Sequence, residues 1–123
     1  MNISVIGTGY VGLVTGATLA NSENKVTCLD IIESKIEQLN QGKSPIFEPG
    51  LEELINIGIK KGQLIGSTEI ERGILESYVT FICVGTPTRK NSNSADLKYV
   101  FAVANQLKKI ISKYKIIITK STV

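Results

Sequence analysis

The sequence predicts an α/β fold, with a doubly wound, mostly parallel sheet and helices on both faces. Short runs of β-branched residues alternate along the chain with segments of helical periodicity, which is the order of successive βαβ units. Glycines are also concentrated directly after the first of these runs, where a helix is expected to begin. The two observations together indicate βαβ units that share one sheet.

Each expected strand is a short apolar run bounded by charged or turn-forming residues. The last run, 116–118, has three isoleucines between Lys115 and Lys120, which is the pattern of a strand buried on both faces. Parallel strands are covered by the helices that follow them, so the covering helix of this strand is expected to be missing. The expected strands are 2–7, 25–30, 63–67, 78–85 and 116–118.

Five helices are expected between these strands, at residues 10–21, 33–40, 51–61, 68–75 and 95–112. The first is rich in small residues, and the fourth has the weakest pattern. In the third, Leu51, Leu54 and Ile55 share a face with Gly58, and Gly62 ends the helix in the manner of a C-cap. The apolar stripe of the fifth consists of Leu97, Val100, Ala104, Leu107 and Ile111.

Composition places the chain among globular proteins of one domain, with 123 residues, 42% hydrophobic and 20% charged. No run reaches the ~18 apolar residues of a membrane span, and the N-terminal run lacks a basic leader. We therefore expect a cytoplasmic protein that does not contact a membrane. The net charge of +3 comes from dispersed lysines without interleaved aromatics, which argues against a nucleic-acid partner.

No metal site is expected, because the chain has no histidine and only two cysteines. Cys28 and Cys83 lie inside apolar runs and are interpreted as buried small hydrophobes. If the strand order is 3-2-1-4-5, the first strand separates them by roughly 9 to 10 Å, which is too far for a disulfide.

The stretch "VIGTGYVG" has glycines at 7, 9 and 12 in the spacing G-x-G-x-x-G of a Rossmann-like turn. Gly7 would permit the sharp turn, Gly9 would let a pyrophosphate approach the backbone, and Gly12 would let the helix lie close to the sheet. Asp30 ends the next strand, at the distance along the chain expected for an acid that binds a ribose. Its charge would repel a 2′-phosphate, so NAD is favoured over NADP. The alternative is a glycine set that serves helix packing alone, with Asp30 capping the following helix.

Four stretches of the chain, "GTGYVGL", "SPIFEPGLEELI", "FICVGTP" and "SADLKYV" to "TKSTV", resemble one family. It is the UDP-glucose/GDP-mannose dehydrogenases, NAD-dependent enzymes that oxidise the C6 alcohol of a nucleotide sugar to a carboxylate. The residues of the second and fourth stretches are most similar to those of the UDP-glucose 6-dehydrogenase branch. In the family "KSTV" continues into further sequence. The resemblance therefore implies that residues 1–123 are an NAD-binding domain, incomplete at its C-terminal end, without the substrate and dimerisation domains.

The resemblance also assigns residue roles where the motifs match. Asp30 and Lys35 would contact the adenosine ribose, and Thr122 would hold a water used in the chemistry. Glu48 matches a family motif, with no role beyond shaping its loop. The pyrophosphate turn would comprise Gly7, Gly9, Tyr10, Val11 and Gly12, the loop beside the cofactor Val84, Gly85, Thr86 and Pro87, and the end of the last strand near the nicotinamide Ser121 and Thr122.

As a full-length enzyme, the protein is expected from this resemblance to convert UDP-glucose to UDP-glucuronate with two NAD, as a homodimer. The catalytic cysteine would lie in the missing part, so this chain alone is expected to be inactive. One alternative is a free-standing dinucleotide-binding or interaction module without catalysis. Others are a GDP-mannose or UDP-N-acetylmannosamine dehydrogenase fragment, and a different NAD enzyme such as a hydroxy-acid dehydrogenase, against which "EPGL" and "KSTV" argue.

Overall fold

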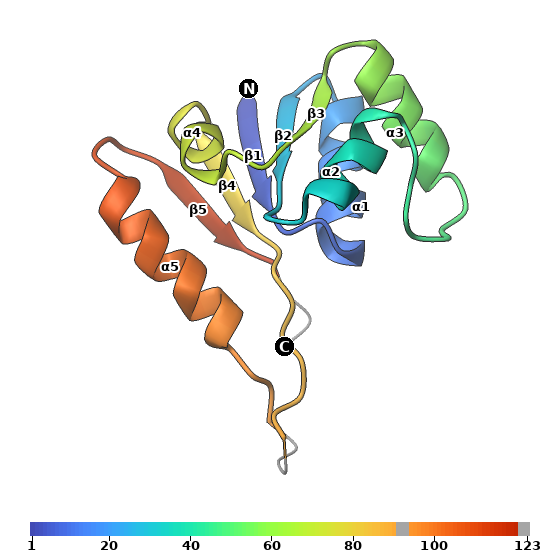
Figure 1. Ribbon diagram of the computed structural model, residues 1–123. Coiled ribbons are helices and arrows are strands. Elements are labelled where there is room, and N and C mark those ends of the chain that lie inside the picture. The colour runs from blue at the N-terminus through green and yellow to red at the C-terminus, as the bar shows by residue number, and fades with distance from the viewer. Residues whose placement is uncertain (91–93, 121–123) are drawn as a thin grey trace.

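The computed structural model describes residues 1–90 and 94–120, and it contains a five-stranded sheet in the order β3-β2-β1-β4-β5 (Figure 1). All four strand pairings are parallel, so the expected order and direction are confirmed. The strands are β1 (Asn2–Ile6), β2 (Lys25–Leu29), β3 (Leu64–Ser67), β4 (Val79–Ile82) and β5 (Ile116–Thr119), and the helices are α1 (Tyr10–Asn21), α2 (Glu33–Asn40), α3 (Leu51–Lys60), α4 (Ile70–Leu75) and α5 (Lys98–Ile110).

Helices cover both faces of the sheet, as a doubly wound fold requires. α1, α2 and α3 lie on one face, and α4 and α5 lie on the other (Figure 1). The chain changes face between β3 and β4, so the strand order reverses beside β1. At such a switch point the loops after neighbouring strands diverge to opposite faces and leave a crevice at the carboxyl ends.

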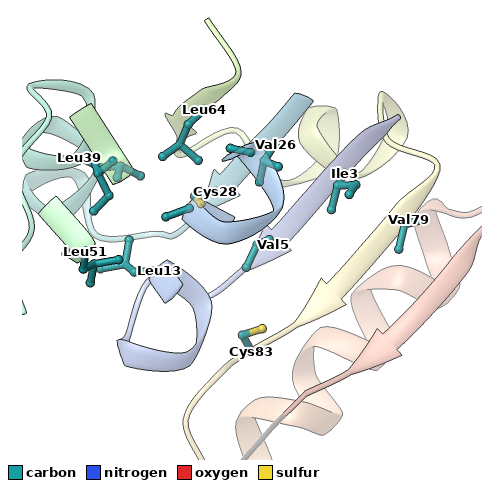
Figure 2. Packing of buried hydrophobic residues seen from close by; sticks show 13 residues of the cluster. Ile3, Val5, Leu13, Val26, Cys28, Leu39, Leu51, Leu64, Val79 and Cys83 are labelled. Carbon is teal, nitrogen blue, oxygen red and sulfur yellow. The ribbon is translucent and has the colours of Figure 1, made fainter. Parts of the chain in front are cut away.

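Alternating side chains of the strands build a separate core on each face. Val5 and Cys28 point toward α1 and α3, in the larger core drawn in Figure 2. Ile6 and Leu29, the next residues along the same strands, pack with Ile74 of α4 and with α5. Central parallel strands are buried on both faces, which explains the successive apolar pairs Val5–Ile6 in β1 and Cys28–Leu29 in β2.

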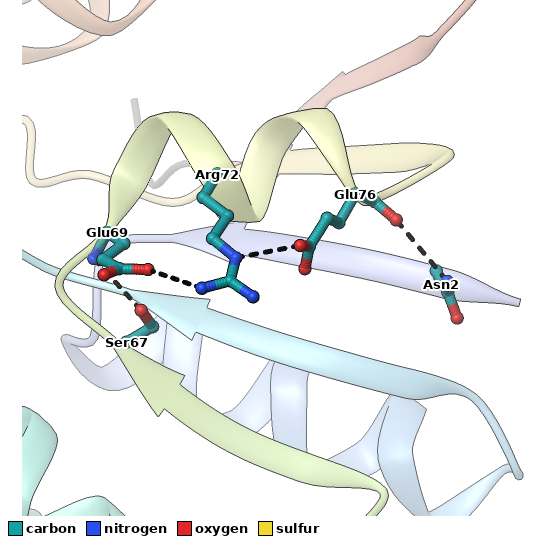
Figure 3. A network of polar contacts seen from close by, with 5 residues as sticks. All are labelled: Asn2, Ser67, Glu69, Arg72 and Glu76. Atoms are coloured by element: carbon teal, nitrogen blue, oxygen red, sulfur yellow. Dashed lines mark hydrogen bonds and ion pairs between the residues drawn. The ribbon is translucent and has the colours of Figure 1, made fainter.

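The short helix α4 carries a polar surface network (Figure 3). Arg72 pairs with Glu69 at 3.3 Å and with Glu76 at 2.9 Å, one turn away on either side. These ion pairs are exposed and contribute little to stability. The buried side of the helix holds it instead, because Ile74 is fully buried and Gly73 lies against Leu29.

The expectation that the last strand is buried on both faces was wrong. β5 pairs with β4, but its isoleucines 116, 117 and 118 remain 36%, 37% and 38% exposed. The reason is that, among the described residues, no helix packs closely on β5, whereas β3 at the other edge is covered by α2 and α3. Lys115, just before β5, donates to the carbonyls of Ile74 and Ser77 at the end of α4 and so fixes the start of the strand.

The fifth helix also differs from its prediction. It begins at Lys98 rather than at 95, because Ala95 forms a bridge with Thr88 and the Asp96 side chain, just before the N-cap residue, accepts the N–H of Lys98. The predicted stripe is partly wrong, since Ala104 is exposed. The side chains that pack on the sheet are Val103, Leu107, Ile110 and Ile111.

None of the helices in the described ranges has the length and apolarity of a membrane-spanning segment.

Candidate functional site

A crevice of about 770 Å³ opens at the carboxyl ends of β1, β2 and β4. Its volume lies within the usual range for small-molecule sites. Gly7 follows β1, Asp30 follows β2, and Gly85 follows β4, and all three line it. The sequence prediction that separate strand ends face one crevice is therefore confirmed for these three positions.

The turn after β1 has the geometry that its glycines predict. Gly7 has a φ of +101°, which favours glycine, and its N–H donates to the carbonyl of Leu29 at 2.8 Å. A Cβ on Gly12 would overlap the Gly7 carbonyl oxygen, so Gly12 is needed for close packing of α1. Gly12 therefore lets the first turn of α1 pack against Gly7, and it does not line the crevice.

Gly9 is different, because no contact within residues 1–90 and 94–120 requires a glycine there. A Cβ built there meets no atom within 4 Å, and its φ of −77° suits any residue. A glycine that packing does not require fits a position reserved for a ligand that approaches the backbone. Gly9 is also the N-cap of α1, and this helix has neither a side-chain cap nor an acidic residue in its first turn.

The carboxylate of Asp30 is held by three donors. Oδ2 accepts the backbone N–H of Thr8 at 3.0 Å and its hydroxyl at 2.6 Å, and Oδ1 accepts the N–H of Ile32 at 3.0 Å. Burial alone would raise the pKa of Asp30. The hydrogen bonds from Thr8 and Ile32, together with nearby Lys35, outweigh burial and hold the pKa below its ordinary value. Asp30 is therefore an anion at neutral pH.

The second wall of the crevice comes from α5 and from the end of the sheet. Tyr99, Ala102, Val103 and Gln106 present one side of the helix to it, and Lys120 borders it beyond β5. This wall was not predicted from the sequence, and neither was Thr8. The motif "SADLKYV" contains Tyr99 and was the available signal, but nothing in it shows which side of α5 faces the crevice.

The predicted site residues are thus partly assembled in one place. Thr86 and Pro87 follow the crevice-lining segment but do not line the crevice. Ser121 and Thr122 lie outside the described residues. The predicted residues that line the crevice are Gly7, Gly9, Tyr10, Val11, Asp30, Lys35, Val84 and Gly85.

Both cysteines are free and buried, as expected. Burial raises the pKa of the Cys28 thiol to about 12 and that of Cys83 to about 11. Neither thiol is therefore ionised near neutral pH, although Cys83 borders the crevice. Within the described ranges, no group of three or more His, Cys, Asp or Glu side chains could hold a metal ion.

Known proteins match the chain over its whole length. The profile of the UDP-glucose/GDP-mannose dehydrogenase family, NAD binding domain, matches residues 1–123. UDP-glucose 6-dehydrogenase YwqF of Bacillus subtilis (strain 168) is 46% identical over 123 residues, which are 100% of this chain and 28% of that protein. The chain thus spans little more than a quarter of the length of such relatives.

Solved structures agree with this match. GDP-mannose dehydrogenase from Pseudomonas aeruginosa, solved as a ternary complex, superposes with a TM-score of 0.95 at 42% identity, over 100% of this chain and 29% of that one. A UDP-glucose dehydrogenase from the archaeon Pyrobaculum islandicum superposes with a TM-score of 0.92 at 36% identity, over 98% of this chain and 28% of that one.

Proposed function

The chain belongs to the UDP-glucose/GDP-mannose dehydrogenase family as its NAD-binding domain, and we propose that it serves as the cofactor-binding part of a nucleotide-sugar dehydrogenase. NAD is the cofactor of this domain. The proposed reaction is oxidation of the C6 alcohol of UDP-glucose to the carboxylate of UDP-glucuronate, with two NAD as hydride acceptors. UDP-glucose is chosen over GDP-mannose because a UDP-glucose 6-dehydrogenase is 46% identical over 100% of the chain, whereas a GDP-mannose 6-dehydrogenase is 45% identical over 87% of it.

The single observation that carries the proposal is the convergence of a glycine turn, a helix N-terminus and an ionised acid on one crevice. We assign the pyrophosphate to the backbone at Gly9, Tyr10 and Val11, where donors and space coincide. Asp30 is assigned to the adenosine ribose, with Lys35 beside it. The apolar side chain of Ile31, 83% exposed at the crevice, suits the adenine ring.

We also propose that the segment after β4 passes beside the cofactor, and that Thr86 and Pro87 shape it. Ser121 and Thr122 retain their proposed place near the nicotinamide, with Thr122 holding a water. A Thr122→Val variant of the full-length protein should keep NAD affinity and lose turnover. Loss of both together would assign Thr122 to binding instead.

This chain alone should not catalyse the reaction. The family chemistry needs a cysteine nucleophile, whereas burial keeps both thiols of residues 1–123 protonated. NAD reduction should therefore be absent when the chain is mixed with NAD and UDP-glucose. Measurable NADH would show that the catalytic groups have been misplaced.

The test of the proposed function is a calorimetric titration with NAD and, separately, NADP. Wild type should bind NAD more tightly than NADP, and Asp30→Ala should weaken NAD roughly tenfold to a hundredfold, because a hydrogen bond to a charged group is lost. Glu33→Ala, which removes the same charge from the exposed start of α2, is the matched control and should bind like wild type. If the folded chain does not bind NAD, the free-standing interaction module becomes the preferred function.

For the whole protein we propose a homodimer in the cytoplasm, with a nucleotide sugar as substrate and neither nucleic acid nor membrane as partner. Two free cysteines fit a reducing compartment. Sedimentation velocity on the full-length protein tests the assembly, and a monomer at all concentrations would refute it. A hydroxy-acid dehydrogenase is not consistent with the family to which the chain belongs.

A further inference from the structure

Thr8 occupies the variable position between the first two glycines of the turn. Its side chain is 2% exposed, although the residue lines the crevice. Its backbone N–H and its hydroxyl both donate to the same atom, Oδ2 of Asp30, at 3.0 Å and 2.6 Å. The hydrogen bond from the hydroxyl to the carboxylate is a short, charge-assisted hydrogen bond.

Counting acceptor sites shows what these bonds leave for a ligand. Each carboxylate oxygen offers about two acceptor sites. Oδ2 of Asp30 uses both for Thr8, and Oδ1 uses one for the N–H of Ile32. One acceptor site on Oδ1 therefore remains for a hydroxyl group that enters the crevice.

The turn itself does not require the Thr8 hydroxyl. The G-x-G-x-x-G pattern leaves this position open, and the backbone N–H would hold the same oxygen whatever the side chain. Valine has the β-branched shape of threonine without the hydroxyl. The hydroxyl therefore adds one specific function, which is to fix the second lone pair of Oδ2 and with it the rotation of the carboxylate.

We propose that Thr8 is a positioning residue for cofactor recognition, whose hydroxyl fixes the Asp30 carboxylate so that one acceptor site on Oδ1 meets a single hydroxyl of the adenosine ribose. The inference rests on the proposed function, because it takes the ligand of Asp30 to be NAD. Thr8 acts through Asp30 and touches no reacting atom. A purely structural role would instead stabilise the turn and leave affinity unchanged in folded variants.

The test compares Thr8→Val with Thr8→Ser in the full chain. Calorimetry with NAD should show roughly three- to tenfold weaker binding for Thr8→Val and binding within about twofold of wild type for Thr8→Ser, which restores the donor. Thr18→Val, at an exposed position of α1, is the matched control and should bind like wild type. Urea unfolding of every variant confirms that folded chains are compared, and Thr8→Ala replaces Thr8→Val if the latter does not fold.

Two further measurements separate positioning from other roles. In an Asp30→Ala background, Thr8→Val should cause no additional loss of NAD affinity, because the group that it positions is gone. NMR titration of the Asp30 carboxyl should give a higher pKa in Thr8→Val than in wild type, and the wild-type value in Thr18→Val.

The outcomes distinguish this inference from the proposed function. Equal NAD affinity of wild type and Thr8→Val would overturn the inference and leave the proposed function intact. The same loss for Thr8→Val with and without Asp30 would also overturn it, since Thr8 would then act independently. Failure of the wild-type chain to bind NAD would overturn both.

Discussion

The side chain of Asn40 pairs with the backbone of Gly66 in both directions. Its Nδ2 donates to the Gly66 carbonyl at 3.0 Å, and its Oδ1 accepts the Gly66 N–H at 2.7 Å. Asn40 ends α2, and Gly66 lies in β3, which is at the opposite edge of the sheet from β5. The amide thus supplies the two bonds that another strand would otherwise offer to this residue.

Removing this pair should destabilise the edge. Asn40→Ala is expected to lower the free energy of unfolding by about 1 to 3 kcal/mol, because Gly66 loses both partners at a buried position. Asn56→Ala is the matched control, since the Asn56 side chain makes one exposed bond to Glu52 and should cost under about 0.5 kcal/mol. Urea unfolding measures both, and equal effects would contradict the role of Asn40.

Gly16 and Cys28 should be coupled in stability. A Cβ on Gly16 would lie 2.7 Å from Cys28 Sγ, so Gly16→Ala should cost about 1 to 3 kcal/mol, less the roughly 1 kcal/mol that alanine contributes in a helix. Cys28→Ala removes the clashing sulfur. The double variant should therefore be at least about 1 kcal/mol more stable than the sum of the single effects predicts.

An exposed control tests whether that coupling is local. Thr18→Ala lies on the same helix and should be additive with Cys28→Ala in urea unfolding. Additivity of Gly16→Ala with Cys28→Ala would show that the helix shifts away from the sheet instead of meeting the sulfur.

Acid should weaken the fold through Asp30. Its pKa in the folded chain lies below the ordinary value of 3.8, so its contribution to stability is present above that value and is lost as the pH falls through the folded pKa. The difference in unfolding free energy between wild type and Asp30→Asn should be largest above about pH 5 and shrink toward pH 3. Urea unfolding across this range measures it, and a constant difference would refute the ionised, hydrogen-bonded carboxylate.

The two cysteines should respond differently to cofactor. Cys83 borders the crevice and is 6% exposed, whereas Cys28 is 1% exposed behind α1. Saturating NAD should therefore slow thiol labelling of Cys83, measured in Cys28→Ala, more than labelling of Cys28, measured in Cys83→Ala. Equal slowing of both would indicate that labelling follows global unfolding alone.

The sequence predicted the elements whose signals are local. α1 and α2 have the expected bounds, because a glycine precedes α1 and an asparagine ends each helix. Gly62 has a φ of +70° after α3, as its C-cap role requires. The burial of β5 was predicted wrongly, because burial depends on neighbouring elements and not on the three isoleucines themselves.

The site divides in the same way. Gly7, Gly9 and Asp30 were predictable because two adjacent strands and a fixed spacing bring them together. The α5 wall, with Tyr99 and Gln106, was not predictable, because its orientation follows from how the helix crosses the second face of the sheet. Thr8 was missed because the pattern treats its position as free.

The crevice is bordered on one side by α1, through Tyr10 and Val11, and on the other side by α5, through Tyr99 and Val103. A bound cofactor therefore acts as a removable cross-link between the two helical layers. At a concentration one hundred times its dissociation constant it should add about 2.7 kcal/mol to the unfolding free energy. Because the ligand holds both layers, that gain should appear in every spectroscopic probe at once, which makes cofactor titration a direct measure of how cooperatively the two layers unfold.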